Sequence, residues 1–224
     1  MFSFLLLNCS KIKNDSEFIE KVNGRYLFNS DEVIEVYFKE NELFFKWRGD
    51  DQIHPLKVNE NTFFVKEMNE KIQFLTNPDD EQDYIVLLPK DKTKEVEYFI
   101  KKMVGNEKVP NEYLKNNEIE KAIAAYAILQ KKDSLDLAIK ENHLNSKGYK
   151  ELSNNNYKNA INYFKVNIAL YPESPNVYDS LGDAFRKSGD SLQAIINYKK
   201  SLELDSSNSR IKRKLNRLEN TDKE

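Results

Sequence analysis

The chain has 224 residues, with 35 Lys and Arg against 37 Asp and Glu, so its formal net charge is −2. At roughly 150 residues per domain, this length suits one large domain or two small ones. The near-neutral charge offers no general attraction for nucleic acid, and one cysteine with two histidines excludes a disulfide framework and a Cys-rich zinc site. We therefore expect no metal, no cofactor and no nucleic-acid partner.

The amino end is apolar up to the only cysteine. Five large apolar side chains in the first seven residues precede Asn8 and Cys9, too few to span a bilayer, which takes about 20. Leu-Leu-Asn-Cys followed by a polar stretch resembles the lipobox end of a bacterial lipoprotein signal, although Asn8 replaces the usual small residue. The resemblance implies lipidation of Cys9, a tether over 1–19 and a bacterial cell-envelope protein facing the periplasm. A cytoplasmic protein with a free Cys9 is the alternative.

Residues 20–92 are predicted to form an antiparallel β module, because their apolar residues alternate with a period of two. Strands are expected over 25–28, 32–39, 42–48, 54–58, 62–66, 72–76 and 84–88. Short strands at this spacing indicate a small barrel or sandwich. Its aromatic residues are expected to form a core. The alternative is a pocket for a lipid or other small apolar ligand, lined by Phe44, Phe64 and Phe74.

Residues 93–224 are predicted to be helical. Apolar spacings of three and four predict helices over 94–104, 112–131 and 134–141. Beyond them the sequence repeats at a constant offset of 34 residues. The firmest aligned pairs are Gly148 with Gly182, Ala160 with Ala194, and Phe164 with Tyr198. Small residues at these positions let two antiparallel helices cross closely.

The repeat resembles the tetratricopeptide repeat, with units at about 141–174 and 175–208. The resemblance implies stacked helix pairs, so the chain as a whole is predicted to be α+β, a small β-barrel or sandwich followed by a helical stack. Lys147 and Asn167 depart from the family pattern, so a looser joint is expected in the first unit. Residues 112–131 match a degenerate half repeat. A last helix, with Ile211, Leu215 and Leu218 inward and a solvated basic face, is expected to cap the stack.

Members of this family bind peptides or protein segments on the concave face of the stack, which the first helix of each unit lines. Carried onto this sequence, the resemblance gives the partner-binding positions Asn142, Asn145, Tyr149, Asn176, Asp179, Asp183, Arg186 and Lys187. The subtype that clamps acidic C-termini is not supported, because Asn145 and Tyr149 occupy two of its Lys and Asn positions. Burial of this face against the β module is the alternative.

A β module followed by repeats also resembles the C-terminal accessory region of Bacteroidetes serine hydrolases of the β-lactamase and penicillin-binding-protein type. Gly-Arg-Tyr at 24–26 and the run 167–182 carry this resemblance. The hydrolase itself is missing, since Ser10-x-x-Lys13 has no downstream Lys-Thr-Gly and the chain has no Gly-x-Ser-x-Gly. We predict a non-catalytic protein-interaction scaffold of the cell envelope. An accessory subunit of a separately encoded serine hydrolase and a lipid carrier are the alternatives.

Overall fold

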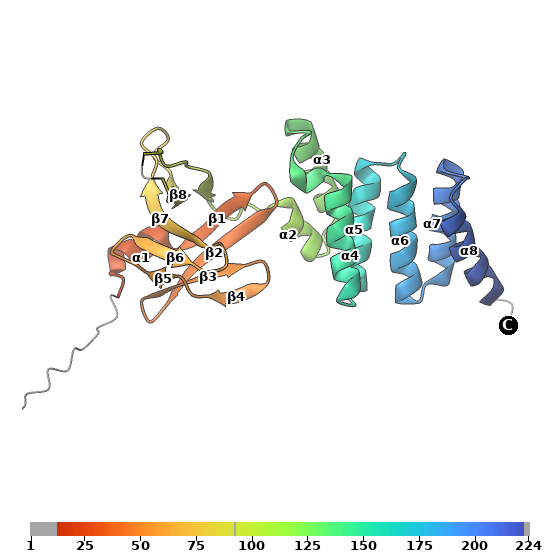
Figure 1. Cartoon of the computed structure of the whole chain (residues 1–224), viewed down its shortest axis with the longest axis horizontal. Helices are drawn as coiled ribbons and strands as arrows, with labels where there is room; N and C mark the ends of the chain where they lie inside the picture. The colour runs from red at the N-terminus through yellow and green to blue at the C-terminus, as the bar shows by residue number, and fades with distance from the viewer. Residues whose placement is uncertain (1–12, 92, 222–224) are drawn as a thin grey trace, which may run out of the picture. The chain divides into compact units, whose positions relative to one another are not determined.

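The computed structural model describes residues 13–91 and 93–221 and divides the chain into two compact units, 1–107 and 108–224. We call them the β unit and the helical unit. The predicted α+β class is confirmed, because the first unit is a curled antiparallel sheet and the second a helical stack (Figure 1). Cys9 and Ser10 lie outside the described residues.

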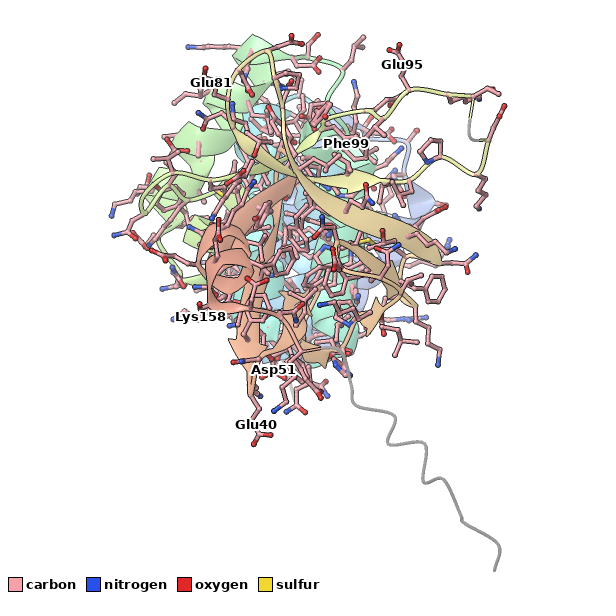
Figure 2. The ribbon with its side chains drawn as sticks, turned by 90° about the vertical axis from the view of Figure 1, so that its left-hand side faces the viewer. Glu40, Asp51, Glu81, Glu95, Phe99 and Lys158 are labelled. Carbon is pink, nitrogen blue, oxygen red and sulfur yellow. The ribbon has the colours of Figure 1, made fainter. Side chains whose placement is uncertain are left out.

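The β unit contains a nine-stranded antiparallel sheet in the order β4-β3-β2-β1-β9-β8-β7-β6-β5. The strands are β1 Gly24–Asn29, β2 Glu32–Lys39, β3 Glu42–Trp47, β4 Asp50–Ile53, β5 Leu56–Lys57, β6 Thr62–Val65, β7 Glu70–Thr76, β8 Asp83–Leu87 and β9 Ile100–Lys102. Each of the seven predicted strands has a counterpart, and β4 and β9 are additional. Figure 2 shows Glu40 at the tip of the β2–β3 turn, where Glu40 and Asn41 adopt positive φ angles of 51° and 66°.

The predicted helix over 94–104 is wrong, because this segment contributes β9, which pairs with both β1 and β8. Ile100 is fully buried whereas its neighbour Phe99 is 48% exposed, the alternation of a strand. A short apolar segment fits both the helical period of 3.6 residues and the strand period of two residues. Here the edges of strands β1 and β8 are available for pairing, and the segment therefore forms a strand. Since β9 joins the two halves of the sheet, the unit ends at residue 107 rather than near residue 92.

The inner face of the sheet holds one apolar core that includes Tyr26, Phe45, Phe63 and Phe74. A short helix, α1 (Ser16–Val22), packs on it through Phe18, whose ring centroid lies 5.9 Å from that of Phe63 and 5.8 Å from that of Phe74. The tether predicted over 1–19 therefore includes the beginning of a helix. Seven residues cannot sustain a helix alone, so packing on the core holds α1 in place.

Asn14 attaches the start of the described chain to two places on the sheet. Its side-chain Nδ2 donates to the carbonyl of Asn41 at 2.9 Å, and its Oδ1 accepts from Lys57 Nζ at 2.8 Å. Asn14 is only 5% exposed, and a buried amide with both ends paired is stabilising. The segment therefore bridges the β2–β3 turn and strand β5.

The helical unit contains the helices α2 Pro110–Lys115, α3 Ile119–Lys132, α4 Glu141–Ser153, α5 Tyr157–Leu170, α6 Pro175–Ser188, α7 Ser191–Leu204 and α8 Ser209–Thr221. Figure 1 shows α4 to α8 stacked side by side. The segment 112–131 is two helices rather than one, because the chain turns at Asn117, where φ is +62°. The helix predicted over 134–141 is also wrong, since only the short 3-10 helix η1 (Leu137–Ile139) forms there.

Helix α8 caps the stack as predicted. Ile211 is 1% exposed and packs with Ala194 and Tyr198 of α7, and Leu215 and Leu218 lie against the same cluster. A terminal helix that buries one apolar face and exposes the other closes a repeat stack.

Candidate functional site

Both repeat units are joined in the same way. A Cβ added to Gly148 would lie 2.5 Å from the Phe164 ring, and one added to Gly182 would lie 2.6 Å from the Tyr198 ring. Each aromatic ring therefore packs directly on the glycine of the facing helix. The expectation of a looser first joint is wrong, because Asn167 is fully buried and its amide donates to the carbonyl of Glu141 at 3.1 Å.

These joints place the first helices of successive units, α4, α6 and α8, next to one another. Asn176 Nδ2 of α6 donates to Glu141 Oε1 of α4 at 3.0 Å, and Tyr149 Oη of α4 donates to Asp183 Oδ2 of α6 at 3.0 Å. We call the surface formed by these three helices the first-helix face. All eight partner-binding positions predicted from the sequence lie on α4 or α6.

A cluster of ion pairs joins α6 to α8 on this face. Lys214 Nζ lies 2.7 Å from Asp179 Oδ1 and 2.7 Å from Asp183 Oδ1, and Arg210 pairs with Asp179 through its guanidinium. Asp179 is 1% exposed, and these two cations compensate the burial of its carboxylate. The solvated basic face predicted for α8 is therefore wrong for Lys214, whose side chain is 19% exposed, whereas Arg210 remains 56% exposed while it pairs with Asp179.

Asp183 has further partners. It accepts hydrogen bonds from Tyr149 Oη at 3.0 Å and from Tyr198 Oη at 2.6 Å. Burial alone would raise the pKa of Asp183, but the hydrogen bonds from Lys214, Tyr198 and Tyr149 outweigh it, and the pKa lies below its ordinary value. Burial raises the pKa of both tyrosines. Asp183 is therefore a charged structural group that links all three first helices.

The 34-residue offset relates two seams of the first-helix face. Asn145, Tyr149, Asn176 and Ser180 occupy the α4/α6 seam at the positions that Asp179, Asp183, Arg210 and Lys214 occupy at the α6/α8 seam. At these four positions the first seam carries uncharged polar side chains, two of which bond to the acids Glu141 and Asp183, whereas the second seam carries two acids matched by two bases. The offset aligns Arg210 and Lys214 with Asn176 and Ser180 of the preceding first helix, and only the structure shows that the two cations reach the aspartates.

The eight predicted positions consequently fall into groups with different surroundings. Asn142, Arg186 and Lys187 are exposed, and Asn145, Tyr149, Asn176 and Asp183 are partly buried. Asp179 is buried. The exposed positions therefore lie at the start of α4 and at the end of α6. The two aspartates of α6 instead form ion pairs with α8.

The three phenylalanines of the alternative apolar pocket do not lie together. Phe74 is in the core of the β unit, whereas Phe44 is on the outer face, stacked on His54 with ring centroids 4.8 Å apart. Phe64 lies between the buried Phe63 and Val65 in strand β6 and therefore also points outward. A pocket shared by the three is not present.

The described residues, 13–91 and 93–221, contain neither a candidate metal cluster nor a candidate membrane-spanning helix. No group of three or more His, Cys, Asp and Glu side chains there is arranged to hold a metal ion. No helix in the same ranges has the length and apolar character needed to cross a bilayer.

Comparison with known proteins identifies the repeat. The tetratricopeptide-repeat family model matches residues 175–208, the unit formed by α6 and α7, so the chain carries a tetratricopeptide repeat. No curated protein matches the chain in sequence.

Solved structures similar to the chain include the first TPR of Spaghetti (RPAP3) bound to the HSP90 peptide SRMEEVD, at 17% identity over 51% of this chain and 88% of that one, with a TM-score of 0.37. MamA is similar at 19% identity over 52% of this chain and 66% of that one, with a TM-score of 0.35. The Sgt2 TPR domain from Aspergillus fumigatus is similar at 17% identity over 51% and 74%, with a TM-score of 0.37.

Proposed function

Because the helical unit contains a tetratricopeptide repeat, we propose that the protein is a non-catalytic interaction scaffold that binds a segment of another protein on its first-helix face. The observation that carries the proposal is the pair of equivalent joints at Gly148 and Gly182, which align α4 and α6 side by side. The alignment leaves Asn142 exposed at the start of α4 and Arg186 and Lys187 exposed at the end of α6, so an extended segment that crosses the face can contact both ends.

The α4/α6 seam favours an uncharged or mixed polar segment. Asn142 carries an exposed amide at the start of this seam, and an amide both donates and accepts hydrogen bonds and so matches the backbone of an extended chain. The α6/α8 seam does not offer its cations to an acidic peptide, because Asp179 and Asp183 already hold Lys214. A peptide carboxylate would have to displace a nearly buried acid from its partner, which is costly.

The proposal places the protein in the bacterial cell envelope, anchored by a lipid on Cys9. The Leu-Leu-Asn-Cys sequence supports this part of it. Binding does not depend on this location, because the first-helix face can bind its segment in any compartment that contains the segment.

The test compares substitutions that change the charge of one exposed side chain. Lys187→Glu alters the exposed end of α6, and Asn142→Arg alters the exposed start of α4. Lys158→Glu is the control, an exposed lysine on the second helix α5, labelled in Figure 2. Native envelope proteins are captured with each variant, and each retained protein is then purified and titrated by calorimetry.

A partner retained by wild type and by Lys158→Glu is expected to bind the two first-helix variants about 10-fold more weakly, roughly 1.4 kcal/mol. Equal binding by all four proteins, or an equal loss with Lys158→Glu, would refute the proposal. A serine hydrolase as the purified partner would favour the accessory-subunit alternative.

A further inference from the structure

Three buried polar atoms without a hydrogen-bond partner lie at one joint of the stack. They are Asn145 Oδ1 of α4, Asn167 Oδ1 of α5 and Ser180 Oγ of α6. Among the residues that the structure describes, the one other such side-chain atom is Trp47 Nε1 in the β unit. A polar atom that is shielded from water and gains no partner destabilises the arrangement that buries it. The α4/α6 seam, with α5 behind it, therefore carries most of this cost.

The equivalent side chains at the next joint all have partners. The offset of 34 residues aligns Asn145 with Asp179, Asn167 with Ser201, and Ser180 with Lys214. Asp179 and Lys214 form an ion pair at 2.7 Å. Ser201 Oγ donates to the carbonyl of Pro175 at 2.6 Å. Because the two joints are built alike, the difference comes from the side chains at these three positions.

Apolar packing and two hydrogen bonds hold the α4/α6 seam closed. Leu152 of α4, Phe164 of α5 and Leu181 of α6 share one core cluster, and the two bonds described above cross the same seam. Burial raises the pKa of Tyr149 and the nearby Ser180 hydroxyl opposes this rise, so Ser180 faces α4. Its Oγ nevertheless has no partner in hydrogen-bond geometry.

Opening has opposite consequences at the two joints. When α6 separates from α4 and α5, the three unpaired atoms gain water as a partner. When α8 separates from α6, the nearly buried Asp179 loses Arg210 and Lys214. We propose that the stack opens at the α4/α6 seam, with the turn 171–174 as the hinge, while α6, α7 and α8 move as one block. The end of a stack ordinarily opens first, so an interior opening is a specific expectation.

The opening bears on the first-helix face. Asn145 and Ser180 belong to the two helices that form this face, so an open seam presents an amide oxygen and a hydroxyl to a bound segment. This role in binding rests on the proposed function. The opening itself needs no partner and is measured on the free protein.

The test measures how fast a thiol reagent reaches a buried position of the full-length chain. Cys9→Ser removes the native thiol, and Ser180→Cys then places one thiol in the seam. Ser201→Cys is the matched control, because Ser201 is also buried but lies between α6 and α7. Reaction with DTNB is followed under native conditions and divided by the rate of the same variant unfolded in urea. We expect Ser180→Cys to react about 10-fold faster than Ser201→Cys. Equal rates, or reaction of Ser180→Cys only through global unfolding, overturn the proposal.

Alanine variants test the same proposal without an added thiol. Ser180→Ala removes a hydroxyl that has no partner, so its urea midpoint is expected to equal or exceed that of wild type. Ser201→Ala breaks the bond to the Pro175 carbonyl, so its midpoint is expected to fall. Equal falls for both variants overturn the proposal, because Ser180 then has a partner in solution. A closed seam in these measurements leaves segment binding intact, and loss of the segment-binding proposal leaves the labelling result intact, so the two failures are distinguishable.

Discussion

Removal of the Lys214 ammonium should release helix α8 from the stack. Lys214→Met keeps an unbranched apolar stem and deletes the group that lies 2.7 Å from both Asp179 and Asp183. Asp179 is 1% exposed and Lys214 has a side-chain exposure of 19%. The two carboxylates would then face each other across a poorly hydrated space with one remaining cation, Arg210.

The expected loss follows from this geometry. Breaking a buried ion pair by removing one partner costs about 3–5 kcal/mol. Arg210 still neutralises part of the charge of Asp179, so we expect about 2–3 kcal/mol of unfolding free energy to be lost. Asp179→Asn combined with Lys214→Met should cost less than the sum of the single changes, because both changes remove the same Asp179–Lys214 ion pair.

The control is a second ion pair that involves α8, formed between Lys199 of α7 and Glu219 of α8. Lys199 Nζ lies 3.0 Å from Glu219 Oε1, but these side chains are 55% and 38% exposed. Lys199→Met is therefore expected to cost less than about 0.5 kcal/mol. Both variants remove one lysine, so a difference between them reports burial rather than net charge.

The assay is urea unfolding followed by far-UV circular dichroism, with hydrogen exchange resolved over α8. Lys214→Met should lower the midpoint and speed amide exchange in α8 before the rest of the helical unit. Equal losses for Lys214→Met and Lys199→Met, or unchanged exchange in α8, would refute the view that buried charge holds this helix.

Three further predictions test other contacts. Gly182→Ala should cost about 1–3 kcal/mol, because the added Cβ would lie 2.6 Å from the Tyr198 ring; an unchanged thermal midpoint would contradict this packing. The pKa of Asp183 is lowered in the folded state, so its stabilisation is present above its unfolded pKa, about 3.9, and is lost as pH falls below it. The difference in unfolding free energy between wild type and Asp183→Asn should therefore shrink between pH 7 and pH 3 in urea titrations, and a constant difference would show that no such charge is involved. Asn14→Ala should cost about 1–2 kcal/mol, since the nearly buried Asn14 amide loses its bonds to the Asn41 carbonyl and to Lys57, and a calorimetric melt with no loss would show that solvent replaces these bonds.

The candidate site was only partly predictable from sequence. The offset of 34 residues places Asn142, Arg186 and Lys187 on first helices, and the structure finds them exposed there. The same offset does not reveal that Asp179 and Asp183 are held by α8, because that depends on how far side chains reach across a seam. Burial converts these two acids from candidate binding groups into structural ones.

Local patterns in the sequence determined the strands of the first unit, the repeat of the second and the capping helix, because periods of 2, 3.6 and 34 are properties of the chain itself. The tertiary structure alone decided that Ile100 belongs to a central strand, since two strands with unpaired edges supplied its partners. It also decided that Phe74 and Phe44 face opposite sides of the sheet and that Lys214 neutralises two acids. Strand pairing and burial bring together residues that are far apart along the chain, and a local sequence pattern does not show which residues these are.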